Sequence, residues 1–219
     1  MLPKSTSLSA EITIKRSRFI ARIDRVDTDE QARAVIAEVR AAMPDARHHC
    51  TAFVVPSEGA LPISRSSDDG EPSGTAGRPM LDVLNGVPLV GAVAVVTRYF
   101  GGTLLGTGGL VRAYSQAVRE ALEGASLAQR TVLPVSLFTV SHADAGRYIA
   151  ELSGRGHEPE MDYDGDGVRI SVASLDVEGV EALVARLSQG SVEVACSGEV
   201  SREVVCAKVN DGRGVPLAQ

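Results

Sequence analysis

The polar segment 64–77 concentrates side chains that could do chemistry. Three carboxylates, Asp68, Asp69 and Glu71, lie within four residues, among three glycines and several small residues. Carboxylate oxygens can bind Mg²⁺ or act as a general base, and glycines let the backbone turn sharply and expose its N–H groups. The spacing alone favours a solvated surface loop with good turn residues. Its length without hydrophobic periodicity shifts the interpretation toward an anion- or metal-handling loop.

The segment Arg98–Gly109 carries five glycines between a buried strand and a helix. Glycines before a helix leave N–H groups free at the positive end of the helix dipole, which is the general arrangement of an anion site. The pattern is not a Walker A motif, because Thr107 stands where the lysine should be. Nor is it the dinucleotide pattern, because the third glycine would fall at Val111. Alternatively, the glycines permit close strand–helix packing and Arg112 pairs with the acidic loop.

The two segments together predict one cleft, in which arginines balance the charge of a phosphate and carboxylates bind Mg²⁺ or act as a base. The hydroxyls of Ser73 and Thr75 are expected to cap the next helix. The candidate cleft and anion-binding residues are Arg65, Asp68, Asp69, Glu71, Ser73, Thr75, Arg98, Gly101, Gly102, Gly106, Gly108, Gly109 and Arg112.

The triplet His48-His49-Cys50 could be metal ligands or a Cys/His pair. Neighbouring strand residues point to opposite faces, so at most one histidine, with Cys50 as a possible second member, would share a site with the acidic loop. A structural histidine is the preferred interpretation. The sequence has no CxxC, no HExxH and no serine nucleophile elbow. We therefore expect no catalytic residue, no metal site and no cofactor, with Mg²⁺ implied only if the cleft is enzymatic.

Cationic side chains cluster near the N-terminus and are opposed only by Asp24. A solvated edge hairpin, whose cations discourage strand pairing, is the alternative to a site for RNA. The possible RNA contacts are Lys15, Arg16, Arg18, Arg22 and Arg25.

Composition limits the possible functions. The 219 residues are 44% hydrophobic and 23% charged, as in globular proteins, and neither a membrane span nor an apolar leader is found. The net charge is −6, with −7 on residues 131–219, so the basic footprint of a duplex-binding protein is missing. Only 4% of residues are aromatic, so few side chains are available to stack on bases. Three cysteines, an odd and small number, argue against a disulfide framework. We expect a cytoplasmic protein without a membrane partner; the sequence gives no oligomeric state.

The acidic loop, the glycine-rich segment, the two histidines and the basic cluster all fall within a first domain, predicted at 1–125. Thr28 and Gln31 have capping-box spacing at the start of a helix that Pro44 ends. The expected elements are two strands within 11–26 around a basic turn, a helix from 28 to 43, a strand at 50–55, a short helix at 79–84, a strand at 90–97 and a helix at 110–122.

A linker at 124–131 leads to a second domain at 131–205, followed by a C-terminal tail at 206–219. The order βαββαβ is that of the ferredoxin-like split motif, so the fold class is α+β with two domains. The expected elements are a strand at 131–140, a helix at 143–153, strands at 158–163 and 167–175, a helix at 177–188 and a strand at 192–201.

The chain resembles a bacterial two-domain member of the YigZ/IMPACT family. Four segments carry the resemblance: Ile14–Ile20, His48–Ala52, Asp68–Pro79 and Arg98–Tyr114. The resemblance implies an N-terminal domain like domain 2 of ribosomal protein S5. It also implies a C-terminal ferredoxin-like domain similar to one of elongation factor G. Eukaryotic members of this family regulate translation by competing for an activator of an initiation-factor kinase.

Three functional hypotheses follow. The preferred one is a non-catalytic, translation-associated binding or regulatory protein that contacts RNA, the ribosome or a translation factor. The alternative is an enzyme or phosphate-ligand binder that uses the cleft between Asp68–Gly77 and Arg98–Gly109. The third is a protein–protein regulator whose acidic second domain attracts a basic partner.

Overall fold

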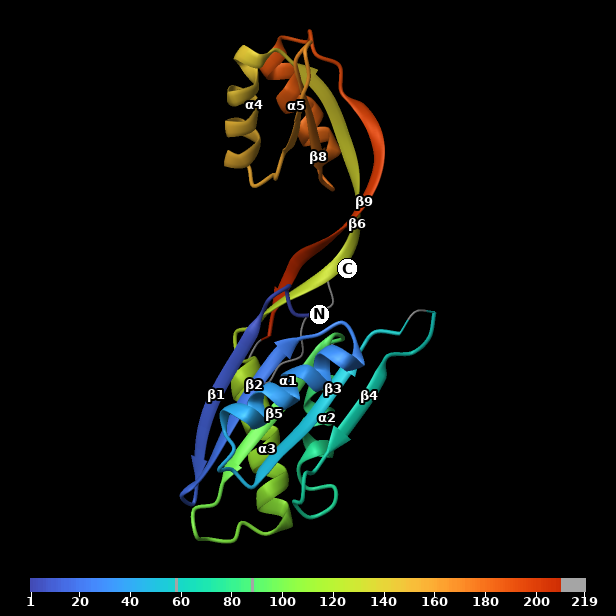
Figure 1. Ribbon diagram of the computed structural model, residues 1–219. Coiled ribbons are helices and arrows are strands. Elements are labelled where there is room, and N and C mark those ends of the chain that lie inside the picture. The colour runs from blue at the N-terminus through green and yellow to red at the C-terminus, as the bar shows by residue number, and fades with distance from the viewer. Residues whose placement is uncertain (58, 88, 210–219) are drawn as a thin grey trace. The chain divides into compact units, whose positions relative to one another are not determined.

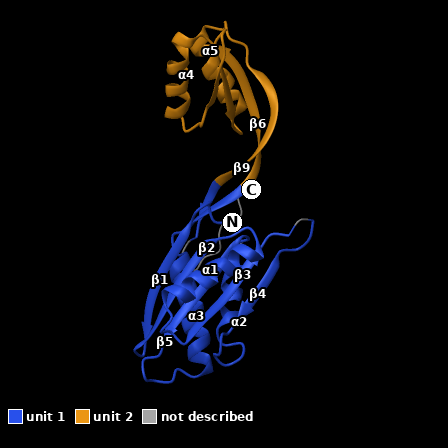
Figure 2. Cartoon of the chain, in the orientation of Figure 1, with its two compact units in different colours: residues 1–129, 205–219 blue, residues 130–204 orange. Residues whose placement is uncertain are grey.

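The computed structural model describes residues 1–57, 59–87 and 89–209. These residues form two compact units, one of residues 1–129 with 205–219 and one of residues 130–204 (Figure 2). Within the described ranges the protein has two sheets and five helices (Figure 1), which confirms the predicted α+β class.

Unit 1 is built on a five-stranded antiparallel sheet with the strand order β1-β2-β5-β3-β4. Its strands are β1 (Ser7–Ile14), β2 (Ser17–Arg25), β3 (His48–Val55), β4 (Ile63–Ser67) and β5 (Ala92–Tyr99). The continuous apolar run of β5 places it in the centre, where both of its faces are buried.

Helices cover both faces of this sheet. On one face, α1 (Asp29–Ala42) packs on Val93 and Val95 of β5. On the other, α2 (Gly77–Gly86) and α3 (Thr107–Leu122) pack on the alternate β5 residues. The Thr28 hydroxyl accepts a hydrogen bond from the Gln31 N–H at the start of α1, which confirms the predicted cap.

Unit 2 has a four-stranded sheet with the strand order β7-β8-β6-β9. Its elements follow one another as strand, helix, strand, strand, helix, strand, in the predicted order. They are β6 (Ser126–Val140), α4 (His142–Gly154), β7 (Glu160–Tyr163), β8 (Val168–Ala173), α5 (Val177–Ser188) and β9 (Ala195–Lys208). Phe138, Tyr148 and Ile170 belong to its buried core.

Three segments differ from the sequence prediction. β6 begins at Ser126 inside the predicted linker, and β9 runs to Lys208 inside the predicted tail. Likewise, residues 63–67 form β4, although they were expected in the loop. All five β4 side chains are exposed, so the strand shows no hydrophobic alternation and is defined by backbone pairing to β3. The predicted tail beyond residue 209 lies outside the described residues.

Candidate functional site

Asp68 organises the loop between β4 and α2. One carboxylate oxygen accepts hydrogen bonds from the N–H groups of Ala76 and Gly77 at 3.0 and 2.8 Å, and the other accepts from Gly74 at 2.8 Å. Partial burial disfavours the charged form, but these three hydrogen bonds outweigh burial and lower the pKa of the carboxyl. Asp68 therefore fixes the start of α2 rather than projecting into solvent.

The predicted helix-capping hydroxyls do not cap α2. Thr75 donates its hydroxyl hydrogen to the Pro72 carbonyl at 2.6 Å, and Ser73 is exposed. The N-cap residue of α2 is Ala76, whose methyl group cannot accept a hydrogen bond. The carboxylate of Asp68, eight residues upstream, accepts from the backbone N–H at this helix start instead. The expectation of a cap from Ser73 or Thr75 was wrong because capping was sought only from residues adjacent to the helix.

Asp69 ties the loop to α1 and β3. Its carboxylate accepts hydrogen bonds from Arg40 at 2.6 Å and from the backbone N–H of His49 at 2.7 Å. Its carbonyl oxygen lies 2.9 Å from Nδ1 of His48, so this ring nitrogen carries the proton. Both oxygens of Asp69 are thus engaged in holding the loop.

His48 and His49 lie on opposite faces of β3, as strand alternation requires. The His49 ring is paired through Nδ1 to the Thr97 hydroxyl at 3.0 Å, and burial lowers the pKa of His49. On the other face, Cys50 donates to the Asp68 carbonyl at 3.0 Å, and burial raises the pKa of its thiol to about 12. A thiol with this pKa is a poor nucleophile near neutral pH.

Glu71 joins the acidic loop to the glycine-rich segment. Its side chain is only 4% exposed and accepts hydrogen bonds from Arg98 at 2.6 Å and from the Tyr114 hydroxyl at 2.7 Å. Burial, with the neighbouring Cys50 and Glu71, raises the pKa of Tyr114, so its phenol keeps the proton that it donates. Glu71, Arg98 and Tyr114 therefore form a buried trio that joins the two segments from which the sequence predicted a cleft.

The guanidinium of Arg98 lies over two aromatic rings. Its guanidinium carbon lies 5.4 Å from the ring centroid of Phe19 and 5.7 Å from that of Phe100. Its Nε is buried and has no hydrogen-bond partner in the described part of the chain. This orphaned donor is the one unsatisfied group of the trio.

The glycine-rich segment begins α3 without a side-chain cap. Gly106 is the N-cap at φ 69°, no acidic residue lies in the first turn, and Gly108 has open space where a side chain would project. Gly101 serves packing instead, since a Cβ there would lie 2.0 Å from the carbonyl carbon of Arg16. Gly101 therefore fits the packing interpretation, and the anion-binding interpretation of the segment stays a prediction.

Several predicted cleft residues are not brought together. Arg65 lies on β4 with its Nε 3.7 Å from the Asp29 carboxylate, away from the acidic loop. Arg112 is exposed on α3 and forms no ion pair with any residue that the structure describes, so its suggested partner in the acidic loop is not found. Sequence analysis named Tyr114 only as the end of a family motif and not as a site residue, although a buried tyrosine hydroxyl needs a hydrogen-bond partner.

The basic cluster is largely neutralised. Arg18 donates to Glu11 at 2.8 and 3.0 Å, and Arg22 pairs with Asp24 and Glu38 at 2.7 and 2.8 Å. Arg25 pairs with Asp27 at 2.5 Å. This leaves Lys15 and Arg16, in the turn between β1 and β2, without an ion pair to the residues described.

The carboxylates of the acidic loop do not form a candidate metal site with other described residues. Among residues 1–57, 59–87 and 89–209, no group of three or more His, Cys, Asp or Glu side chains could hold a metal ion. Since Asp68, Asp69 and Glu71 point to backbone amides, arginines and a phenol, they form a scaffold for the loop.

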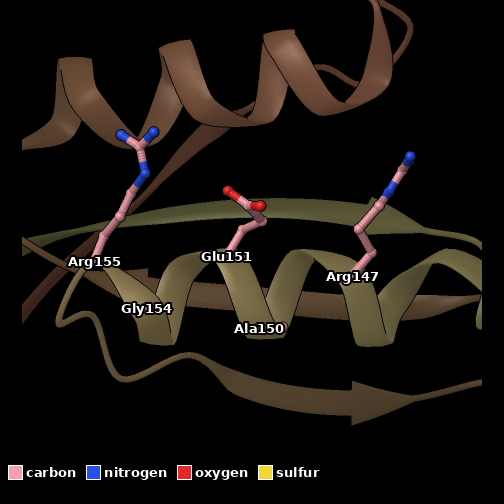
Figure 3. A pocket seen from close by; sticks show the side chains of 5 residues that line it. All are labelled: Arg147, Ala150, Glu151, Gly154 and Arg155. Atoms are coloured by element: carbon pink, nitrogen blue, oxygen red, sulfur yellow. The ribbon is translucent and has the colours of Figure 1, made fainter.

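Unit 2 carries a shallow pocket that the sequence analysis did not find. It has a volume of about 340 Å³ and is lined by Arg147, Ala150, Glu151, Gly154 and Arg155 (Figure 3). Arg147 and Glu151 lie four positions apart on one face of α4, and Arg155 follows as its C-cap residue. Of these residues, Glu151 pairs with Arg186 of α5 at 2.9 Å.

Comparison with known proteins shows which family this architecture represents. A family model described as the Impact N-terminal domain matches residues 15–122. The chain is 40% identical over 187 residues to IMPACT family member YigZ of Escherichia coli (strain K12), covering 83% of this chain and 90% of the relative. The chain belongs to the IMPACT family.

Solved structures include further relatives of this IMPACT family member. A crystal structure of a protein described as hypothetical is 36% identical, with a TM-score of 0.56 over 89% of this chain and 96% of the other. A structure of the two-domain translational regulator Yih1 is 28% identical, with a TM-score of 0.38 over 56% of this chain and 48% of the other. None of the helices seen in the described residues is long and apolar enough to cross a membrane.

Proposed function

We propose that this IMPACT family member is a non-catalytic, translation-associated regulatory protein that contacts RNA or a ribosome-linked factor. The observation that carries the proposal is the internal use of Asp68, Asp69 and Glu71, whose oxygens hold the fold. The neighbouring surface instead presents unpaired cations and exposed apolar side chains at Phe100 and Leu104. Such a surface suits binding rather than bond chemistry.

The family supports the link to translation. The resemblance implies that eukaryotic members regulate translation, and residues 15–122, which match the family model, contain every motif that carries the resemblance except Ile14. We further propose a cytoplasmic location and no membrane partner or resident cofactor.

The finer fold names belong to the same proposal. The order of elements in unit 2 and its strand order β7-β8-β6-β9 support a ferredoxin-like domain similar to one of elongation factor G. For unit 1, the family resemblance supports a domain like domain 2 of ribosomal protein S5.

A phosphate-ligand binder is the second candidate, favoured by the uncapped N-terminus of α3 and by the exposed Arg112. If Mg²⁺ bound together with such a ligand, its ligands would be the phosphate oxygens, or loop carboxylates that had first left their present hydrogen bonds. If this candidate is right, nucleotides or sugar phosphates should raise the melting temperature, and Arg112→Ala should remove the shift.

Sedimentation with ribosomes tests the proposed function. The protein should appear in ribosomal fractions at low salt, leave them as salt rises, and alter the yield of a cell-free translation reaction. The variant Arg119→Ala, which removes an exposed cation near the end of α3, serves as a control and should behave as wild type. Absence of association at every salt concentration, with no effect on translation, would overturn the proposal.

A further inference from the structure

We propose that Phe100 is a stacking platform for an unpaired base of single-stranded RNA, and that Lys15 and Arg16 contact the adjacent phosphates. The inference rests on the proposed function and deepens it, because it names the class of RNA and the residues that bind it.

Phe100 is exposed yet supported from one side. The residue is 54% exposed and follows β5 directly. The Arg98 guanidinium lies over one face of its ring, with the guanidinium carbon 5.7 Å from the centroid. Since Arg98 covers one face and half of the residue is in solvent, the remaining ring surface is open to a ligand.

The support beneath Phe100 is rigid. The Arg98 side chain is 7% exposed and its Nη1 donates to Glu71 at 2.6 Å, while Tyr114 donates to the same carboxylate oxygen at 2.7 Å. A ring held in this way loses little conformational entropy when a base stacks on it. The Glu71–Arg98–Tyr114 trio thus connects the acidic loop to the binding surface.

The turn between β1 and β2 brings two cations next to Phe100. The Gly101 N–H donates to the Ser17 hydroxyl at 3.1 Å, and Arg16 Nη2 donates to the Thr103 hydroxyl at 3.2 Å. Figure 1 shows this turn beside the segment between β5 and α3. Lys15 and Arg16 are exposed and lack a carboxylate partner among residues with described positions.

Lys15 and Arg16 have a backbone conformation that is energetically unfavourable for residues with a Cβ atom. Lys15 and Arg16 have φ values of 45° and 66°, in the left-handed region where a two-residue hairpin turn usually has Asn-Gly. Strain of this kind persists where a site requires particular side chains. Two cations in place of Asn-Gly therefore indicate that their charge is needed at this position.

Local charge favours an anionic ligand despite the net charge of −6. Neither segment 12–23 nor segment 97–119 contains an aspartate or glutamate. At 0.1 M salt, charges more than about 10 Å away are screened. The nearby Glu71 carboxylate is buried and paired with Arg98, so Lys15 and Arg16 are the exposed charges that a ligand at Phe100 would meet.

The ring distinguishes single-stranded RNA from other anions. A duplex keeps its base faces stacked and hidden, whereas an unpaired base offers a flat face to Phe100. An acidic protein segment would pair with the cations but would gain no specific advantage from an aromatic ring over an aliphatic one.

Fluorescence anisotropy with labelled oligouridine and oligoadenosine ten-mers, against a ten-base-pair RNA duplex, tests the inference. Wild type should bind the single strands and not the duplex. Phe100→Leu, which keeps an apolar side chain without a flat face, should weaken binding about tenfold, and Phe100→Trp should retain it. Replacing Lys15 and Arg16 by alanine should reduce the salt dependence of log K by about 1.4, for two lost phosphate contacts.

Matched controls separate the surface from general effects. Arg119→Ala removes a cation and Leu61→Ala removes an apolar side chain that is 88% exposed, and neither should change RNA affinity. Equal binding by Phe100→Leu and wild type, or equal binding of duplex and single strand, would overturn the inference. Ribosome association without single-stranded RNA binding would overturn it while leaving the proposed function standing. If Phe100→Leu and the alanine variant of Lys15 and Arg16 lost ribosome association but kept their affinity for single-stranded RNA, the inference would be overturned and the surface would be one that binds protein.

Discussion

At the scale of single residues, Asp68 shows how a motif carboxylate can be structural. Its two oxygens accept three backbone N–H groups that the loop and the first turn of α2 would otherwise leave unpaired. The chemistry that suggested a metal ligand in the sequence is the same chemistry that satisfies backbone donors.

Replacing Asp68 with asparagine should lower the free energy of unfolding by about 2 kcal/mol, because the amide nitrogen cannot accept a hydrogen bond. Urea unfolding measures this loss. The control Asp82→Asn breaks only an exposed pair with Arg78 and should change stability by less than about 0.5 kcal/mol. Equal stability of Asp68→Asn and wild type would show that the three hydrogen bonds contribute nothing net.

The same carboxyl predicts a pH dependence with a definite sign. Its folded pKa lies below the ordinary value of 3.8, so its stabilisation is present above that pH and is lost as pH falls through the lowered pKa. The stability difference between wild type and Asp68→Asn should therefore be constant near neutral pH and shrink in acid. Urea unfolding curves across this range measure it, and a difference that grows in acid would contradict the assignment.

The buried pair of Glu71 and Arg98 predicts strong coupling. Their side chains are 4% and 7% exposed, so removing one partner leaves a buried charge alone. Arg98→Met and Glu71→Gln should each destabilise the fold, Arg98→Met by about 3–5 kcal/mol, and the double variant should cost clearly less than the sum. Strictly additive losses in a double-mutant cycle would show that the two groups do not interact.

At the scale of elements, the turn of the β1–β2 hairpin is expected to lower the stability of the protein while supplying the cations that bind RNA. Replacing Lys15 by asparagine and Arg16 by glycine should stabilise the protein by about 1–2 kcal/mol, because both positions have positive φ. Alanine at both positions is the control, because it removes the cations without relieving the backbone. Thermal unfolding of the two variants distinguishes backbone strain from charge repulsion.

Elements with a strong hydrophobic pattern were predictable from the sequence, and others were not. The apolar run of β5 and the Thr28 cap of α1 follow from local rules that the tertiary structure leaves unchanged. β4 was missed because all of its side chains are exposed and only backbone pairing defines it. The site was half predictable, since the acidic loop does meet Arg98, but Tyr114 reaches Glu71 from 43 residues away in sequence.

At the scale of the whole molecule, the ends of the chain contribute to unit 1. Residues 205–209 belong to this unit, although they follow unit 2 in sequence. Val209 is 9% exposed and its backbone exchanges hydrogen bonds with Gly124 and Ala125, at 3.0 and 2.9 Å. Cys206 Sγ also lies 3.6 Å from the Leu127 carbonyl oxygen.

Two deletions should therefore differ in stability. Removing residues 130–219 takes away the end of β9 and the following Val209, whereas replacing residues 130–204 by a short Gly-Ser turn keeps both. The second variant should be more stable by about 2–4 kcal/mol, from burial of Val209 and two backbone hydrogen bonds. Urea unfolding of both variants decides the point. Equal midpoints would mean that residues 205–209 add nothing to the stability of unit 1, and a higher midpoint for the turn-linked variant would mean that they are part of its core.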